Sequence, residues 1–153
     1  LLEDESITYE FLHQNDSSIV HPAVGRLAFL LEAGGVRLRW ITTGESEWTG
    51  LPIDNAALEP LNRRGPRTLP LKQEAWNQVR VQRTGGEILV HLNGELIYQR
   101  PIEPNADTTF GLYRTARAHE VTIRNAIMTG NWPSTVPQDF LADPLTLASA
   151  ETP

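Results

Sequence analysis

The acidic side chains are the first residues that could do chemistry, because hydrolysis of a glycoside needs two carboxyl groups flanking the bond that breaks. Acidic residues cluster at residues 3–5, at Glu45 and Glu47, and at Asp54 and Glu59. No cluster falls in a segment with the alternation of a strand, which would hold two carboxyl groups on one face. We therefore interpret these residues as solvated surface acids and predict no catalytic residue.

The sequence also lacks the spacing of a metal or nucleophile site. No His-x-His or His-x-x-x-His pair indicates a zinc site among the four histidines, which are His13, His21, His91 and His119. The chain has no cysteine, which excludes disulfides, thiolate ligands and cysteine nucleophiles. Residues 15–16 and 105–107 carry oxygen atoms that calcium could use, but a role in turns is sufficient to explain them. We expect no cofactor and no metal, and calcium has no support beyond these two turns.

Arginine, amide and aromatic side chains give a better indication of a binding surface. Those predicted to face away from a core, or to lie in a loop, are Arg37, Arg39, Trp48, Gln78, Arg80, Gln82 and Tyr113. If some of them line one sheet, they form a groove that could bind uronic or sulfated sugars, because guanidinium groups pair with acidic groups in a bidentate way. Trp48 could stack on a sugar ring or anchor its loop. An ordinary solvated face of mixed polarity remains the alternative.

We take five of these residues as the candidate ligand-binding set: Arg37, Arg39, Trp48, Arg80 and Tyr113. The elements that must position them are strands. Apolar and polar residues alternate, or β-forming residues gather, in residues 6–13, 25–32, 36–42, 77–83, 108–114 and 120–129. In the strand of residues 36–42, this alternation puts Val36, Leu38 and Trp40 on the core face.

The clearest local signal is a hairpin centred on Asn93-Gly94. Both residues tolerate the positive φ of a type I′ turn, and apolar runs flank them. A two-residue loop predicts three cross-strand pairs: Leu92 with Glu95, His91 with Leu96, and Val90 with Ile97. This meander cannot bury its apolar face alone, so it needs a second sheet, which we expect to contain the strands of residues 6–42.

The sequence therefore predicts an all-β fold, a two-sheet antiparallel β-sandwich. Trp40 and Trp76 are expected in its core. Residues 1–133 are expected to form one domain with a long loop at 44–70, which contains four prolines, and residues 134–153 an extended tail.

Composition limits the classes of partner. The net charge is −6 and the bases are interleaved with acids, which argues against nucleic-acid binding. No apolar run is long enough to insert into a membrane. The chain begins with Leu1 and its only methionine is Met128. We therefore expect a piece of a larger protein, and an extracellular or periplasmic location is favoured.

Several segments resemble the concanavalin A-like lectin/glucanase superfamily, which includes laminin-G-like and keto-disaccharide-hydrolase-like domains. They are residues 76–81 (WNQVRV), 92–94 (LNG), 110–112 (FGL) and 121–125 (VTIRN). More narrowly, residues 48–51 (WTGL), 62–66 (NRRGP), 69–71 (LPL) and 129–133 (TGNWP) look like a domain of unknown function in large planctomycete proteins. The resemblance covers residues 6–133. It implies a concanavalin A-like jelly roll whose curved face often carries a ligand, commonly a glycan.

Glucanases of that superfamily carry an acid-x-acid-x-x-acid pattern on one strand, and no strand here has it. We therefore interpret the chain as a non-catalytic recognition module of an exported protein. It would bind carbohydrate, including acidic glycans, or a neighbouring protein domain. A glycoside-acting hydrolase and a structural spacer remain the alternatives.

Overall fold

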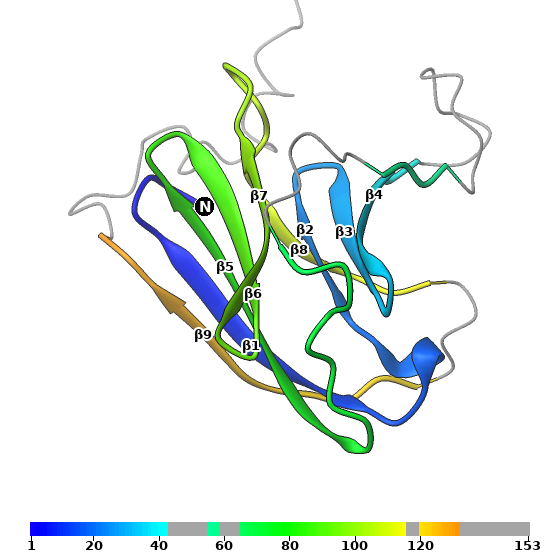
Figure 1. Cartoon of the computed structure of the whole chain (residues 1–153). Coiled ribbons are helices and arrows are strands. Elements are labelled where there is room, and N and C mark those ends of the chain that lie inside the picture. The colour runs from blue at the N-terminus through cyan, green and yellow to red at the C-terminus, as the bar shows by residue number, and fades with distance from the viewer. Residues whose placement is uncertain (43–54, 59–64, 116–119, 132–153) are drawn as a thin grey trace, which may run out of the picture.

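The computed structural model describes residues 1–42, 55–58, 65–115 and 120–131. This part of the chain contains no α-helix, one short 3-10 turn, η1 (Asp16–Ser18), and nine strands. The strands are β1 (Ser6–His13), β2 (His21–Val24), β3 (Leu27–Glu32), β4 (Gly35–Trp40), β5 (Ala75–Thr84), β6 (Glu87–Leu92), β7 (Glu95–Pro101), β8 (Phe110–Tyr113) and β9 (Ile123–Thr129). They form two antiparallel sheets that pack face to face (Figure 1). The predicted β-sandwich is confirmed.

The two sheets differ in size. Sheet A has the order β7-β6-β5-β1-β9, and sheet B has the order β4-β3-β2-β8. Strand β1 pairs with β5 over its whole length, from Ser6↔Gln82 to His13↔Ala75. The expectation that β1 belongs to the sheet opposite the meander is therefore wrong. The apolar alternation of β1 fits either sheet, so the pattern alone could not decide between them.

The hairpin between β6 and β7 forms as predicted at its turn. Asn93 and Gly94 have φ values of 52° and 86°, and Leu92↔Glu95 and His91↔Leu96 pair as expected. Further from the turn the register shifts by one residue, because Val90 pairs with Tyr98 and not with Ile97. This bulge lets both Ile97 and Tyr98 be buried.

The core lies between the two sheets. Tyr9, Phe29 and Tyr98 are among its largest fully buried side chains. The Tyr9 hydroxyl donates a hydrogen bond of 2.7 Å to the Val20 carbonyl, which joins β1 of sheet A to the segment that leads into sheet B. Trp76, predicted to be in the core, instead lies half-buried on the outer face of sheet A. There Arg124 lies 3.9 Å from its ring centroid.

Strand β2 is the element that the sequence did not predict. It is only four residues long and contains Pro22. Its ladder with β3 consists of the pairs Ala23↔Ala28 and Val24↔Leu27, so the missing N–H of Pro22 costs no bond to β3. Beyond these pairs, a side chain links the two strands in place of the backbone: His21 accepts a hydrogen bond from the Leu31 N–H at 3.0 Å.

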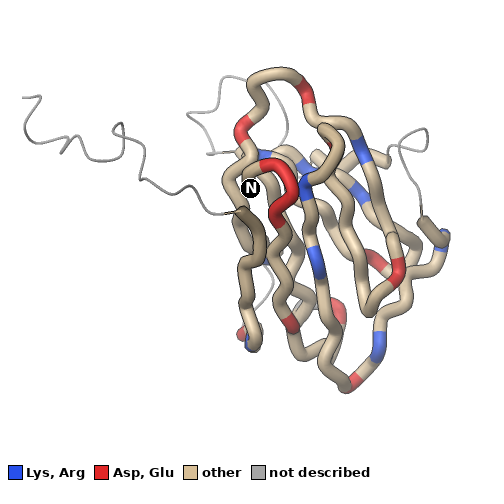
Figure 2. The backbone as a smooth tube through the Cα atoms, turned by 90° about the vertical axis from the view of Figure 1, so that its left-hand side faces the viewer, with Lys and Arg blue, Asp and Glu red and all other residues tan. Residues whose placement is uncertain are grey.

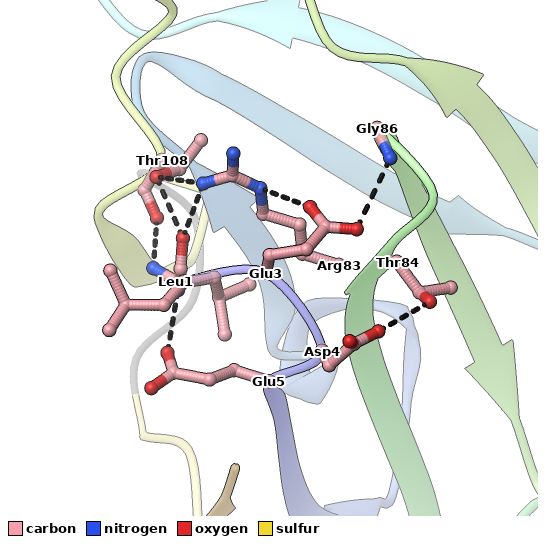
Figure 3. Close-up of polar contacts among 9 residues, drawn as sticks. Leu1, Glu3, Asp4, Glu5, Arg83, Thr84, Gly86 and Thr108 are labelled. Atoms are coloured by element: carbon pink, nitrogen blue, oxygen red, sulfur yellow. Dashed lines mark hydrogen bonds and ion pairs between the residues drawn. The ribbon is translucent and has the colours of Figure 1, made fainter. Parts of the chain in front are cut away.

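The segment before β1 is held by Arg83 of β5 (Figure 3). The Arg83 guanidinium donates to the Leu1 carbonyl at 2.9 Å and pairs with Glu3 at 3.2 Å. Next to it, the Thr84 hydroxyl donates to Asp4 at 2.8 Å. These contacts fix the chain where it enters sheet A. Over the rest of the molecule, acidic and basic residues are interspersed along the backbone (Figure 2).

Candidate functional site

The outer face of sheet B brings together three of the five predicted binding residues. Strand alternation places Arg37 and Arg39 of β4, and Tyr113 of β8, on the side away from the core. Strands β3 and β2 lie between β4 and β8. Even so, the Arg39 guanidinium carbon lies 5.6 Å from the centroid of the Tyr113 ring. That distance is within the range of a cation–π contact.

Small residues in the intervening strands explain how Arg39 reaches Tyr113. Arg39 pairs with Ala28, Ala28 with Ala23, and Ala23 with Gly111, so one row across the sheet carries no large side chain after Arg39. Ala23 and Ala28 are buried, in a cluster with Leu30 against which Ile41, Ala56 and Tyr113 pack. This row of small side chains thus leaves room above the sheet for the side chains of Arg39 and Tyr113 to meet.

Arg37 holds a neighbouring segment of the chain. Its guanidinium donates to the Ala56 carbonyl at 2.8 Å and lies 3.5 Å from the Glu32 carboxylate. Ala57 pairs with Leu38 of β4, so residues 55–58 lie along the edge of sheet B. Both partners of the Arg37–Glu32 ion pair are exposed, and such pairs contribute little to stability. Positioning residues 55–58 is the clearest role of Arg37.

His21 belongs to the same face, although sequence reasoning did not select it. It pairs with Tyr113 across β2 and β8, and the two ring centroids are 6.2 Å apart. The side chain is buried, and this burial lowers the pKa of His21 to about 4. His21 is therefore neutral at neutral pH. The only sequence signal was a histidine in a short β-forming run, which the adjacent proline obscured.

A cavity of about 360 Å³ opens beside His21 at the end of sheet B. Among the described residues, its polar lining consists of Asp16 of η1, His21, Glu32 at the end of β3, and Thr115 just after β8. Figure 1 shows η1 and the ends of β3 and β8 gathered at one end of the sheet. The cavity thus continues the surface that Tyr113 and Arg39 begin.

The remaining two predicted binding residues do not join this surface. Arg80 of β5 is exposed on the outer face of sheet A, where it lines a hollow of about 260 Å³ with Gln78, His91 and Gly94. Burial and the nearby Arg80 charge lower the pKa of His91. The core separates this face from that of Arg39, so one sugar residue cannot contact both. Trp48 lies outside the described residues.

A third cavity, of about 540 Å³, contains two carboxyl groups, Glu103 and Asp107, beside Trp40. Glu103 pairs with Arg100 at 2.5 Å. Hydrogen bonds from Thr109 lower the pKa of Asp107. Inverting and retaining glycosidases need a carboxyl group whose pKa is raised, so that it can donate a proton. Asp107 is shifted in the opposite direction and does not fit that role.

The described residues contain no group of three or more acidic or histidine side chains placed to hold a metal ion. Within the same part of the chain, no helix has the length and apolar character that crossing a bilayer requires.

The family of the chain follows from its sequence as a whole. A family described as a domain of unknown function, DUF1583_N, matches residues 1–135. The chain belongs to this family. The match spans every described strand of both sheets. No curated protein is a significant match to this DUF1583_N domain.

A solved structure shows the same fold at low sequence identity. The galectin LEC-6 from Caenorhabditis elegans is similar with a TM-score of 0.53 and 12% identity, over 84% of each chain. Two further structures are similar with lower scores. The botulinum neurotoxin serotype D binding domain has a TM-score of 0.43 and 13% identity, over 82% of this chain and 33% of the toxin chain. The PL7 alginate lyase AlyA1 from the marine Zobellia galactanivorans has a TM-score of 0.42 and 13% identity, over 84% of this chain and 63% of the lyase chain. The galectin match identifies the DUF1583_N domain as a jelly-roll sandwich.

Proposed function

We propose that this DUF1583_N domain is a non-catalytic recognition module that binds carbohydrate on the outer face of sheet B. The observation that carries the proposal is the contact between Arg39 and Tyr113 across a floor of alanine and glycine. An aromatic ring offers an apolar surface for the C–H groups of a sugar, and a guanidinium group offers several N–H donors for its oxygen atoms. The galectin fold is compatible with this use of a sheet face.

The charge of Arg39 extends the proposal to acidic glycans. A uronate or sulfate group would pair with the guanidinium group and leave the Tyr113 ring to contact the sugar.

We also propose that the parent protein is a large exported protein of a planctomycete, which the resemblance of its sequence motifs supports. A neighbouring domain of that protein is the other candidate partner.

A glycan array at low and high salt tests the proposal. We expect binding that Tyr113→Ala and Arg39→Gln each weaken about tenfold, the equivalent of about 1.4 kcal/mol. Binding through Arg39 to an acidic glycan should also weaken at high salt, because salt screens exposed charges. Arg80→Gln is the matched control, since it removes an arginine from the outer face of sheet A.

The outcomes separate the alternatives. Loss of binding in Arg80→Gln but not in Arg39→Gln would move the site to sheet A and contradict the proposal. If no glycan on the array binds but a neighbouring domain of the parent protein does, the partner of this domain is a protein and not a carbohydrate.

A further inference from the structure

The cavity at the end of sheet B carries a hydrogen-bond donor that the described protein leaves unused. The Nδ1 atom of His21 accepts the Leu31 N–H at 3.0 Å, so the proton of the neutral ring is on Nε2. Among the described residues, none makes a hydrogen bond with Nε2. The residue is only 4% exposed and lines the cavity, so the cavity is the space from which a ligand could reach its ring.

Acceptors lie around the same space. The carboxylates of Asp16 and Glu32 and the hydroxyl of Thr115 line the cavity, together with apolar atoms of Ile19, Leu30 and Ala33. Its volume of about 360 Å³ is at the small end of the range for sites that hold a small molecule. The cavity therefore combines one fixed donor, several acceptors and an apolar wall.

We propose that this cavity binds the hydroxyl groups of one uncharged sugar residue, at the end of a glycan that continues over Tyr113. A sugar hydroxyl both accepts and donates a hydrogen bond. The His21 Nε2–H would donate a hydrogen bond to the oxygen atom of that hydroxyl. A carboxylate of Asp16 or Glu32 would accept a hydrogen bond from its O–H group. This inference rests on the proposed function and adds the chemical class of the residue that enters the cavity.

Electrostatics disfavour an acidic group at this position. His21 is neutral at neutral pH, and the charged groups among the described lining residues are the carboxylates of Asp16 and Glu32. Glu32 is partly balanced by Arg37 at 3.5 Å, and among the described residues that line the cavity none is basic. A uronate would be repelled here, although Arg39 could pair with one further along the face. The cavity and the outer face of sheet B would thus bind different parts of one glycan.

The test reads the His21 ring directly by NMR of the histidine nitrogen atoms in the intact domain. The probes are the methyl glycosides of glucose, galactose and mannose, with glucuronic acid and calcium as comparisons. We expect at least one neutral glycoside to shift the Nε2 signal of His21, with little effect on His91, which lies on the other sheet. Glucuronic acid should not compete. A shift with calcium alone, or with glucuronic acid in preference to the neutral sugars, would overturn the proposal.

A steric variant adds a measurement that does not depend on replacing His21. Ala33 is exposed and lines the cavity, so Ala33→Trp should fill it and weaken the binding of a neutral glycoside about tenfold or more. Ala106→Trp is the matched control, because Ala106 is an exposed alanine that lines the cavity beside Trp40. Both variants should unfold at nearly the same temperature as the wild type.

The two proposals fail in different ways. If Tyr113→Ala weakens glycan binding while Ala33→Trp has no effect, the outer face of sheet B binds carbohydrate and the inference about the cavity is wrong. If no glycan on the array binds but a neutral glycoside shifts the His21 signal and Ala33→Trp abolishes the shift, the cavity binds sugar without help from Arg39 and Tyr113. If no neutral glycoside shifts the His21 signal at its solubility limit, the cavity does not bind sugar.

Discussion

At the scale of single residues, His21 makes the stability of the domain depend on pH. In the folded protein its pKa is about 4, whereas an unfolded histidine takes up a proton near pH 6.5. Between these values the unfolded state binds more protons, so the free energy of unfolding falls as the pH is lowered. We expect a loss of about 3 kcal/mol from pH 6.5 to pH 4, measured by urea denaturation.

The control for this prediction is His21→Asn, because the Asn oxygen atom can accept the Leu31 N–H without titrating. The lowered pKa of His91 acts in the same direction, so a smaller pH dependence should remain in this variant. An unchanged pH profile in His21→Asn would show that His21 is not the group responsible.

Gly65 is a position where even one added carbon atom has no space. A Cβ atom there would lie 2.2 Å from the Ile97 carbonyl oxygen and 2.5 Å from its carbon, in the bulge of β7. These are backbone atoms, which cannot rotate away. We expect Gly65→Ala to lower the free energy of unfolding by about 1–3 kcal/mol. Gly34→Ala is the control, since an added Cβ meets nothing within 4 Å, and denaturation curves of the two variants provide the test.

At the scale of elements, Asn77 ties β5 to the chain before it and to the β6–β7 turn. Its side chain is fully buried and bonds both the N–H and the carbonyl of Lys72 at 2.8 Å. It also donates a hydrogen bond to the Ala75 carbonyl at 3.0 Å and accepts one from the side-chain amide of Asn93 at 2.9 Å. Asn77→Ala leaves several buried groups without partners, so we expect a loss of about 2–4 kcal/mol.

The measurement is thermal unfolding of Asn77→Ala beside Gln78→Ala, which truncates an exposed neighbour in the same strand. Equal melting temperatures for the two variants would mean that the Asn77 network contributes little. Hydrogen exchange adds a local readout, because we expect faster exchange of the Lys72 amide only in Asn77→Ala.

The elements also show where sequence reasoning succeeds. Strands β5 and β6 alternate regularly, so period two predicts them and their buried faces, whereas β1 is predicted by its β-forming residues. The bulge at Ile97 could not be predicted, because two adjacent apolar residues fit either register. Strand β2 has only four residues, one of them proline, so it shows no period that the sequence could reveal. His21 was therefore not selected as a candidate residue. The Arg39–Tyr113 contact needed strand order, which no local pattern encodes.

At the scale of the whole molecule, Tyr9 links the two layers of the sandwich by one buried hydrogen bond. Tyr9→Phe keeps the ring but leaves the Val20 carbonyl without its 2.7 Å partner. We expect a loss of about 1–2 kcal/mol in the free energy of unfolding, measured by chemical denaturation. Thr8→Val is the comparison, because Thr8 is the adjacent residue and faces out of the core. A loss confined to Thr8→Val would contradict the role of the Tyr9 hydroxyl.

The position of β1 also has a consequence for the order in which the domain can fold. Strand β1 is made first, yet its two neighbours in sheet A are β5 and β9, and Ser6 pairs with Thr129, 123 positions later. Folds with such distant pairs form slowly, because large loops must close before the pairs contribute. A nascent chain that ends before Ile123 exposes an unpaired edge of β1, where other chains can add. Synthesis of the last strand, rather than the first, therefore determines when this domain is protected from aggregation.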